Sequence, residues 1–168
     1  FQFLLNLNSK KGLYIMEKIN LNDTVPNFEL EGTNNLFFNL SDFKGKYIVI
    51  YFYPKDSTPG CTNEGLDFKE NISKFKKMNV EIFGVSRDNI KSHEKFKAKY
   101  NFPFELLSDS EEIACDLFDV IKMKNMYGKK VRGIERSTFL LNPEGKLMNE
   151  WRGVKVNGHI EEILKVLK

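Results

Sequence analysis

The chain has 168 residues, a length typical of one domain. Hydrophobic residues make up 41% of it and charged residues 29%, a composition that excludes a disordered, collagen-like or coiled-coil protein. The 26 basic and 23 acidic residues leave a net charge of +3, and this near balance gives no reason to expect nucleic acid or an anionic membrane as a partner.

The first 15 residues are predicted to lie outside the folded domain. The chain begins with Phe1, and no basic residue precedes the short apolar start, so residues 1–15 resemble a cloning remnant or a misassigned upstream start more than a signal peptide. We therefore expect a single domain over residues 16–168. Apolar runs are too short for a membrane span, and Cys61 and Cys115 are too few for a disulfide scaffold, which predicts a soluble, cytoplasmic protein.

The hydrophobic pattern alternates between strands and helices. An unbroken apolar run over residues 47–53 predicts a strand buried on both faces. After it we expect a helix carrying Phe68, Ile72 and Phe75, then a strand over residues 80–86, then a helix capped by Asp88 that carries Ile90, Phe96 and Tyr100. A short strand at Leu106 and Leu107 should follow, and after it a helix that begins with a capping box of Ser108 and Glu111 and carries Ile113, Leu117 and Val120. The chain should end with a hairpin of residues 137–141 and 146–152 and a final helix carrying Ile160, Ile163, Leu164 and Leu167.

This order of elements predicts the fold class. Alternating strands and helices, followed by a hairpin and a helix, indicate an α/β three-layer sandwich in which helices flank a mixed central β-sheet. The basic stretch of residues 122–132 is expected to be a solvated loop.

Cys61 lies where the loop of residues 54–60 meets the first helix. Unpaired N–H groups and the helix dipole stabilise a thiolate at such a position, and a nearby Arg would do the same. From composition alone, a buried and unreactive cysteine is the simpler interpretation. The placement favours reactivity, because α/β folds put their sites at the carboxyl ends of strands.

The same loop carries a recognisable motif. Pro54, Thr58 and Cys61 match the pattern Pro-x-x-x-Thr/Ser-x-x-Cys, and further matching segments lie at residues 84–88, 107–109, 135–139 and 142–145. Over about residues 21–168 the sequence resembles the peroxiredoxins, and among them the bacterioferritin-comigratory, or Q-type, subfamily. The resemblance implies a thioredoxin-like fold and an antioxidant peroxidase that reduces hydrogen peroxide and organic hydroperoxides without metal, flavin or other cofactor.

The resemblance also implies roles for four residues. Cys61 would be the peroxidatic thiolate, Thr58 would hold the peroxide through its hydroxyl, Pro54 would shield the site from water, and Arg136 would complete it. These roles are chemically reasonable, because thiolate attack on an O–O bond develops negative charge on the leaving oxygen, which a guanidinium and a hydroxyl stabilise. Without the resemblance, Thr58 would be an ordinary turn residue, Pro54 a strand stop and Arg136 the surface partner of Glu135.

The sequence departs from the subfamily at the resolving cysteine. The two usual positions hold Leu66 and Lys97, which leaves Cys115. Acidic neighbours disfavour a thiolate there, so a packing role is the preferred interpretation of Cys115 over a resolving one. We expect a one-cysteine cycle in which an external thiol, such as thioredoxin, glutaredoxin or glutathione, reduces the sulfenic acid of Cys61. A monomer or weak dimer is expected.

Two other classes of protein remain possible from the residues. A thioredoxin-like binding or holdase protein without turnover would explain the missing resolving cysteine. A disulfide oxidoreductase normally needs Cys-x-x-Cys, and the second position of that motif is Glu64 here. His93 and His159 are expected to be packing or cap residues, and two histidines with two cysteines give no metal-ligand spacing.

Overall fold

The computed structural model describes residues 5–8, 13–16 and 18–168, with side chains from residue 18 onward. Its strands are β1 (Leu5–Asn8), β2 (Leu13–Met16), β3 (Glu29–Gly32), β4 (Phe37–Asn39), β5 (Tyr47–Phe52), β6 (Val80–Ser86), β7 (Glu105–Ser108), β8 (Ile121–Met126), β9 (Lys129–Ile134), β10 (Ser137–Leu141) and β11 (Leu147–Arg152). Its helices are the 3₁₀ helix η1 (Leu40–Phe43) and the α-helices α1 (Pro59–Glu70), α2 (Ile72–Lys77), α3 (Ile90–Tyr100), α4 (Ile113–Leu117) and α5 (His159–Leu167).

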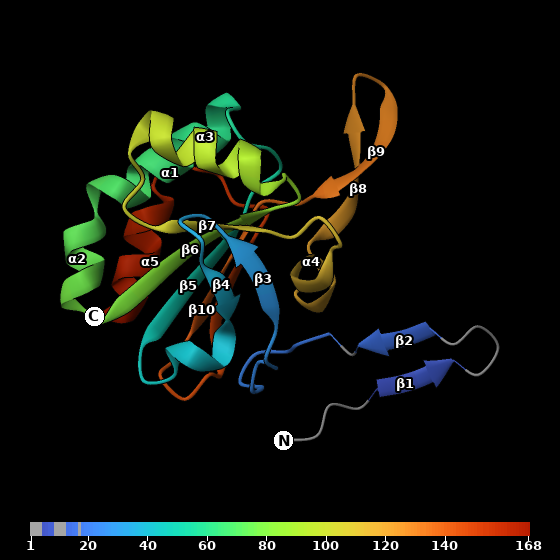
Figure 1. The fold of residues 1–168 in the computed structure, drawn as a ribbon, viewed down its shortest axis with the longest axis horizontal. Helices are drawn as coiled ribbons and strands as arrows, with labels where there is room; N and C mark the ends of the chain where they lie inside the picture. The colour runs from blue at the N-terminus through green and yellow to red at the C-terminus, as the bar shows by residue number, and fades with distance from the viewer. Residues whose placement is uncertain (1–4, 9–12, 17) are drawn as a thin grey trace.

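A mixed sheet forms the centre of the molecule (Figure 1). Its order is β11-β10-β5-β6-β7-β3-β4. Strands β5, β6 and β7 are parallel to one another. Strand β10 pairs antiparallel with β5 and β11 on one side of them, and β3 pairs antiparallel with β7 and β4 on the other side. The parallel strands are consecutive in space and are joined by helices, so right-handed crossovers place α1 and α3 on the same face. The carboxyl end of β5 leads directly into the loop that carries the motif.

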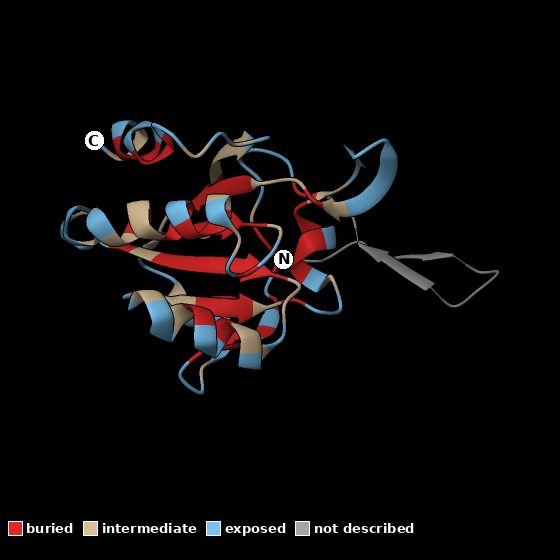
Figure 2. Ribbon diagram, turned by 90° about the horizontal axis from the view of Figure 1, so that it is seen from above, coloured by how far each residue is buried: buried red, intermediate tan, exposed pale blue. Residues whose placement is uncertain are grey.

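Two hydrophobic cores lie on the two faces of this sheet. One core packs Tyr51 against residues of α1, α2, α3 and α5, and the other packs Phe52 against residues of α4 and η1. Successive residues of a strand point to opposite faces, so the five buried residues of β5 after Tyr47 contribute to both cores. Figure 2 shows buried residues along the strands and on the helix sides toward them. The predicted three-layer α/β sandwich is confirmed.

Two predictions about individual elements are wrong. The single helix expected through Phe68 and Phe75 is broken at Asn71, whose N–H bonds to both Lys69 O and Phe68 O and which separates α1 from α2. The expected loop of residues 122–132 is largely the β8–β9 hairpin. Its turn residues Tyr127 and Gly128 both have positive φ, 53° and 80°, which suits a tight two-residue hairpin turn. The many lysines of this segment are typical of a solvated loop, which is why the sequence pattern does not indicate a hairpin.

The helix caps also differ from those predicted. The N-cap of α3 is Asn89, whose side chain accepts from Ser92 N at 2.8 Å, in place of Asp88. The start of α4 is held by Asp109, which accepts from the backbone N–H groups of Ile113 and Cys115, so the capping box of Ser108 and Glu111 is wrong. A carboxylate one residue after Ser108 satisfies two helix N–H groups at once, which a hydroxyl does not.

Gly65 allows α1 to pack closely on Phe102. A Cβ atom at this position would lie 2.5 Å from Phe102 Cζ, closer than side chains approach one another. We expect Gly65→Ala to lower the free energy of unfolding by about 1–3 kcal/mol, as overpacking of a filled core does. Urea denaturation measures this, and Asn63→Ala, on the exposed side of the same helix, is the control with an expected change below about 0.5 kcal/mol. Equal stability of both variants would contradict the close packing.

The predicted extension of residues 1–15 is described only in part. Strands β1 and β2 pair antiparallel in a two-stranded sheet of their own, and the predicted boundary at residue 16 falls at the end of β2. Whether the domain begins there stays a prediction. Among the described residues, no helix has the length and apolar character needed to cross a bilayer.

Candidate active site

Cys61 lies at the start of α1, beside the carboxyl end of β5. The helix begins at Pro59, so Cys61 is its third residue, and Thr58 is the N-cap with extended backbone angles. The first N–H groups of a helix lack partners within the helix and carry the positive end of its dipole. The side chain is 2% exposed and belongs to the core on the α1 face. The Cys61 sulfur therefore lies at the positive end of a helix dipole, in a site shielded from bulk water.

Arg136 reaches Cys61 from the connection between β9 and β10. Its Nη2 donates to Cys61 Sγ at 3.5 Å, and its Nη1 donates to Glu64 Oε1 at 2.7 Å. Burial opposes the charge, but the Glu64 carboxylate and the Cys61 sulfur together raise the pKa of Arg136. The fold thus places a permanently charged guanidinium within hydrogen-bond distance of the Cys61 sulfur.

Gly60 provides the space that this guanidinium occupies. A Cβ atom at Gly60 would lie 3.1 Å from Arg136 Nη2, a contact tighter than side chains normally make. A larger residue here would push the guanidinium away from Cys61. The glycine beside the motif cysteine therefore helps to position Arg136.

Glu64 is a further member of the site, and its role is not predicted from the sequence. In the sequence, Glu64 stands only where a Cys-x-x-Cys motif would have its second cysteine. On α1 it lies one turn after Cys61, is 1% exposed, and forms an ion pair with Arg136. Its Oε2 atom is buried and has no hydrogen-bond partner among the described residues. The available signal was the spacing of three residues from Cys61, which places both side chains on one helix face.

The pKa of Glu64 predicts a pH-dependent stability. Burial raises this pKa from 4.5 to about 7, against the opposing effect of Arg136. Because the pKa of Glu64 is higher in the folded state than in the unfolded state, the protonated form of Glu64 stabilises the fold. This stabilisation is complete below pH 4.5 and is lost as the pH rises through 7. From pH 5 to pH 8, we expect wild type to lose on the order of 2–3 kcal/mol of unfolding free energy relative to Glu64→Gln. Urea denaturation of both proteins at the two pH values measures it, and a difference that does not change with pH would contradict it.

Thr58 and Pro54 flank the cysteine within the same loop. Thr58 Oγ1 donates to Lys55 O at 2.9 Å, which leaves the oxygen lone pairs free to accept a further hydrogen bond. Pro54 is half-buried and follows Tyr53 at the end of the central strand. No hydrogen bond joins the side chain of Thr58 to Cys61 in the described part of the chain, and the roles of Thr58 and Pro54 stay predictions.

Cys115 lies on the other face of the sheet from Cys61. It is fully buried in the core on the α4 face, and both cysteines are free thiols. Burial and, after it, the Asp109 carboxylate raise the pKa of the Cys115 thiol. The two positions where the subfamily usually has a resolving cysteine hold Leu66, half-buried on α1, and Lys97, which is ion-paired with Glu105.

His93 belongs to a buried polar cluster behind the motif loop. Its Nδ1 lies 2.7 Å from Asp56 Oδ2 and its Nε2 lies 2.9 Å from Leu107 O. Asp56, Asp88 and His93 each offer one potential metal-ligand atom within 4.8 Å of the others. Two of its three members are aspartates, so the spacing of histidines and cysteines in the sequence does not predict this group. Asp56 also accepts from Ser92 and Tyr53, so hydrogen bonds within the protein already engage its carboxylate.

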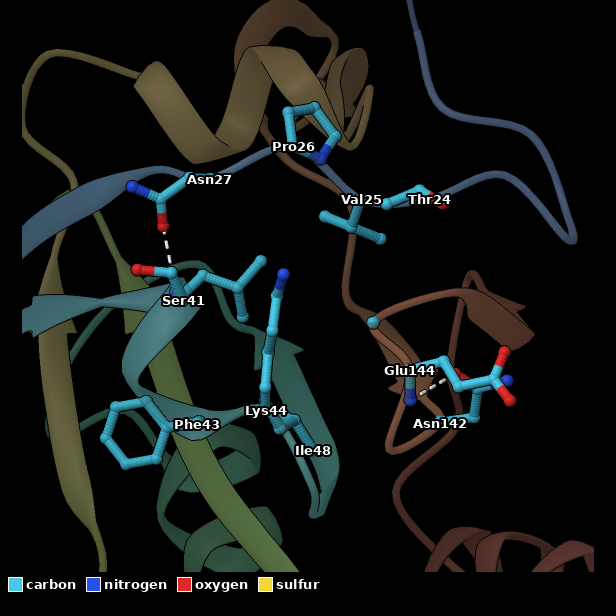
Figure 3. Close-up of a pocket in the computed structure, with 12 residues that line it drawn as sticks. Thr24, Val25, Pro26, Asn27, Ser41, Phe43, Lys44, Ile48, Asn142 and Glu144 are labelled. Carbon is cyan, nitrogen blue, oxygen red and sulfur yellow. Dashed lines mark hydrogen bonds between the residues drawn. The ribbon is translucent and has the colours of Figure 1, made fainter. Parts of the chain in front are cut away.

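A cavity lies at the opposite end of β5 from Cys61 (Figure 3). It encloses about 300 Å³ and is lined by Val25, Phe43 and Ile48 among others, with Lys44 at its wall. Ile48 is near the start of β5 and Pro54 follows its end, a distance of about 20 Å along an extended chain. This cavity therefore lies apart from the thiol chemistry.

Fold and site together define the class of protein: a thioredoxin-like sheet with a buried cysteine in the first turn of a helix, within hydrogen-bond distance of an arginine. The AhpC/TSA family profile matches residues 21–149. Peroxiredoxin Bcp of Xanthomonas campestris is 60% identical over 124 residues, covering 74% of this chain and 78% of the relative. Peroxiredoxin Bcp of Bacillus subtilis is 50% identical over 150 residues, covering 89% and 96%.

Solved structures agree with these matches. A mutant PrxQ of Xylella fastidiosa superposes with a TM-score of 0.85 at 46% identity, covering 90% of this chain and 96% of the other. The bacterioferritin comigratory protein of X. campestris, studied for alkyl peroxide reduction, gives 0.79 at 54% identity, covering 83% and 89%. The chain belongs to the AhpC/TSA family, in its Bcp, or Q-type, peroxiredoxin subfamily. It is a thiol-dependent peroxidase with a thioredoxin-like fold, as the resemblance predicted, and a holdase without turnover is not favoured.

Proposed function

We propose that Cys61 is the peroxidatic residue, that it reduces hydrogen peroxide and organic hydroperoxides, and that an external thiol completes the cycle. The contact of 3.5 Å between Arg136 Nη2 and Cys61 Sγ carries this proposal, because it pairs a permanent positive charge with the nucleophile. The position of Cys61 in the first turn of α1 supports it independently.

The oxidative half of the cycle follows from this geometry. The Cys61 thiolate attacks one peroxide oxygen, an S–O bond forms as the O–O bond breaks, and the leaving oxygen takes a proton to become water or an alcohol. Cys61 is oxidised to the sulfenic acid and the peroxide is reduced. Negative charge moves from the sulfur to the leaving oxygen, so the Arg136 guanidinium stabilises both the start and the end of the transfer.

Thr58 and Pro54 are proposed to hold and shelter the peroxide. The Thr58 hydroxyl donates to Lys55 O, and rotation about the Cβ–Oγ1 bond would redirect this donor to a substrate oxygen. Pro54 has no N–H to bind water and lies half-buried at the end of β5. Both residues belong to the loop that precedes Cys61, which supports these roles.

The reductive half is proposed to use an external thiol in a one-cysteine cycle. Cys115 lies on the opposite face of the sheet, and a disulfide needs Cα atoms within about 7 Å. The candidates are thioredoxin, glutaredoxin and glutathione. We further propose that the protein works as a monomer or weak dimer in the cytoplasm, where such thiols are kept reduced.

A peroxidase assay tests the proposed function. Purified protein should consume hydrogen peroxide and cumene hydroperoxide catalytically with dithiothreitol as the reductant. Consumption should continue after metal chelation, since a thiolate needs no metal to attack the peroxide. Failure to turn over either peroxide, with Cys61 confirmed reduced by thiol titration, would contradict the proposal.

A further inference from the structure

The buried polar cluster behind the motif loop, residues 54–60, lies outside the thiol chemistry. Its centre is Asp56, a residue of this loop that is 6% exposed. Three side chains bind its carboxylate: Tyr53 Oη lies 2.7 Å from Oδ1, Ser92 Oγ lies 2.8 Å from Oδ2, and His93 Nδ1 lies 2.7 Å from Oδ2. The part of the chain that the structure describes leaves no buried side-chain oxygen or nitrogen of this cluster without a hydrogen-bond partner. A fully satisfied buried network of this kind holds one arrangement of its members.

His93 connects this loop to the end of the parallel part of the sheet. It is completely buried on α3, its Nε2 lies 2.9 Å from Leu107 O in β7, and its Nδ1 faces Asp56. A carbonyl oxygen can only accept, so Nε2 carries a proton and donates it to Leu107 O. Because Nδ1 and Asp56 Oδ2 are 2.7 Å apart, one proton lies between them, whichever of the two atoms holds it. The imidazole therefore forms a bridge with a hydrogen bond at each end.

The backbone of Asp56 controls the direction of the Thr58 hydroxyl. Asp56 N donates to Asp88 Oδ2 at 2.9 Å. Lys55 O, the carbonyl of the same peptide unit, accepts from Thr58 Oγ1 at 2.9 Å. A peptide unit is planar, so a change in the direction of its N–H also turns its carbonyl. Movement of Asp56 would therefore redirect the hydroxyl that is proposed to hold the peroxide.

The backbone at Ser57 shows that this loop needs an anchor on each side. Its φ of 62° lies in the left-handed region, which a residue with a side chain seldom adopts. Such a conformation persists only where the surrounding structure fixes it. Before Ser57, the cluster binds the Asp56 carboxylate, and after it the first turn of α1 begins with the bond from Thr62 N to Thr58 O, 2.9 Å. The anchor at Asp56 therefore holds the turn that leads into Thr58.

We propose that His93 is a positioning residue for peroxide reduction: through Asp56, it fixes the loop that aims the Thr58 hydroxyl at the substrate. This inference rests on the proposed roles of Cys61 and Thr58, and it adds a residue of α3, a helix outside the motif. His93 acts by geometry alone and contacts neither the peroxide nor the thiol. Loss of its bond to Asp56 should therefore slow the attack of Cys61 on the peroxide and leave the reactivity of the thiolate itself unchanged.

The thiol and the cluster belong to separate hydrogen-bonded groups. Arg136 links Cys61 to Glu64, and within residues 18–168 no side-chain hydrogen bond joins these three residues to Asp56 or His93. Iodoacetamide alkylates a thiolate without a hydroxyl to hold it, so its rate constant reports the thiolate alone. The rate constant with hydrogen peroxide reports both the thiolate and the position of the substrate. The ratio of the peroxide rate constant to the iodoacetamide rate constant therefore measures positioning.

Two amide variants separate the two ends of the imidazole bridge. The side-chain nitrogen of Gln reaches the place of Nε2, so His93→Gln keeps a donor for Leu107 O and loses the bond to Asp56. The shorter amide of Asn takes the place of Nδ1, so His93→Asn keeps the bond to Asp56 and loses the other. All proteins carry Cys115→Ala, which leaves Cys61 as the only thiol. We expect the ratio of rate constants to fall about tenfold in His93→Gln and to stay within about twofold in His93→Asn.

Two further variants show whether the effect runs through Thr58. In Thr58→Val, which lacks the hydroxyl, adding His93→Gln should change the ratio by less than about twofold, because the group that His93 positions is gone. The matched control is His159→Gln. His159 is also buried, at 3% exposed, and its Nε2 lies 2.8 Å from Thr138 Oγ1, so this variant makes the same chemical change in another buried polar contact. It should change the ratio by less than about twofold.

Ser92→Ala gives a second test that retains the imidazole. It removes another donor from Asp56 Oδ2 and should lower the ratio about threefold. An unchanged ratio in folded His93→Gln or, where that variant does not fold, in Ser92→Ala would overturn the proposal. Equal losses in His93→Gln and His93→Asn, an equal loss in His159→Gln, or a tenfold loss that persists without the Thr58 hydroxyl would overturn it too. A Cys61 that reacts with iodoacetamide but not with hydrogen peroxide when Cys115→Ala is the sole change would instead contradict the proposed function.

Discussion

Replacing Cys61 with Ser is expected to abolish peroxide consumption, with a fall of at least about a thousandfold in kcat/KM at neutral pH. A hydroxyl in the same place is protonated and is a far weaker nucleophile toward peroxide oxygen than a thiolate. The helix amides and Arg136 cannot compensate, because they stabilise an anion that serine does not form. The measurement is the rate of hydrogen peroxide loss with dithiothreitol as reductant.

Cys115→Ala is the matched control for this experiment. Cys115 lies in the core on the α4 face, away from Cys61, so its removal should leave peroxide turnover within about twofold of wild type. Its effect should be a modest loss of stability from the missing sulfur, seen in the unfolding transition. If Cys115→Ala were as inactive as Cys61→Ser while remaining folded, a two-cysteine cycle would replace the proposed one.

Replacing Arg136 has the second largest expected effect. Arg136→Met removes the donor 3.5 Å from Cys61 Sγ and should lower the rate constant for oxidation of Cys61 by about 10²–10³. Arg136→Lys keeps the charge but loses the fork that binds Cys61 and Glu64 at once, so its loss should be smaller, roughly tenfold. Stopped-flow tryptophan fluorescence after mixing reduced protein with peroxide measures the rate constant.

Arg136→Met also leaves the Glu64 carboxylate buried without its partner, which lowers stability. Combining it with Glu64→Gln should recover stability but not the oxidation rate, because the amide replaces the charge and does not restore the guanidinium. A double variant that regains the wild-type rate would show that Arg136 acts only by holding the structure together.

The parts of the fold with strong periodicity could be predicted from the sequence. The run over residues 47–53 and the strand of residues 80–86 are buried on both faces, so their composition alone indicates β-structure in a central position. The break at Asn71 could not be predicted, because Phe68 and Phe75 retain helical spacing across it. The hairpin at residues 121–134 could not be predicted either, because its turn geometry and cross-strand pairing stabilise it, while its many lysines are typical of a solvated loop.

The candidate site divides in the same way. Cys61 and its flanking residues form a contiguous motif, so the sequence identifies them. Arg136 is 75 residues away, and only the family resemblance links it to Cys61 before the fold is known. Glu64 has no motif of its own, and its importance follows from burial and from the ion pair with Arg136, which are properties of the folded chain.

The most direct test of the central claim is the intact mass of wild type, Cys61→Ser and Cys115→Ala after one equivalent of hydrogen peroxide, with a trap for sulfenic acid present. We predict the trap adduct on wild type and on Cys115→Ala, and none on Cys61→Ser. Loss of two hydrogens in wild type alone, without an adduct, would instead show a disulfide with Cys115 and would contradict the one-cysteine cycle. An adduct on Cys61→Ser would contradict the assignment of Cys61 as the peroxidatic residue.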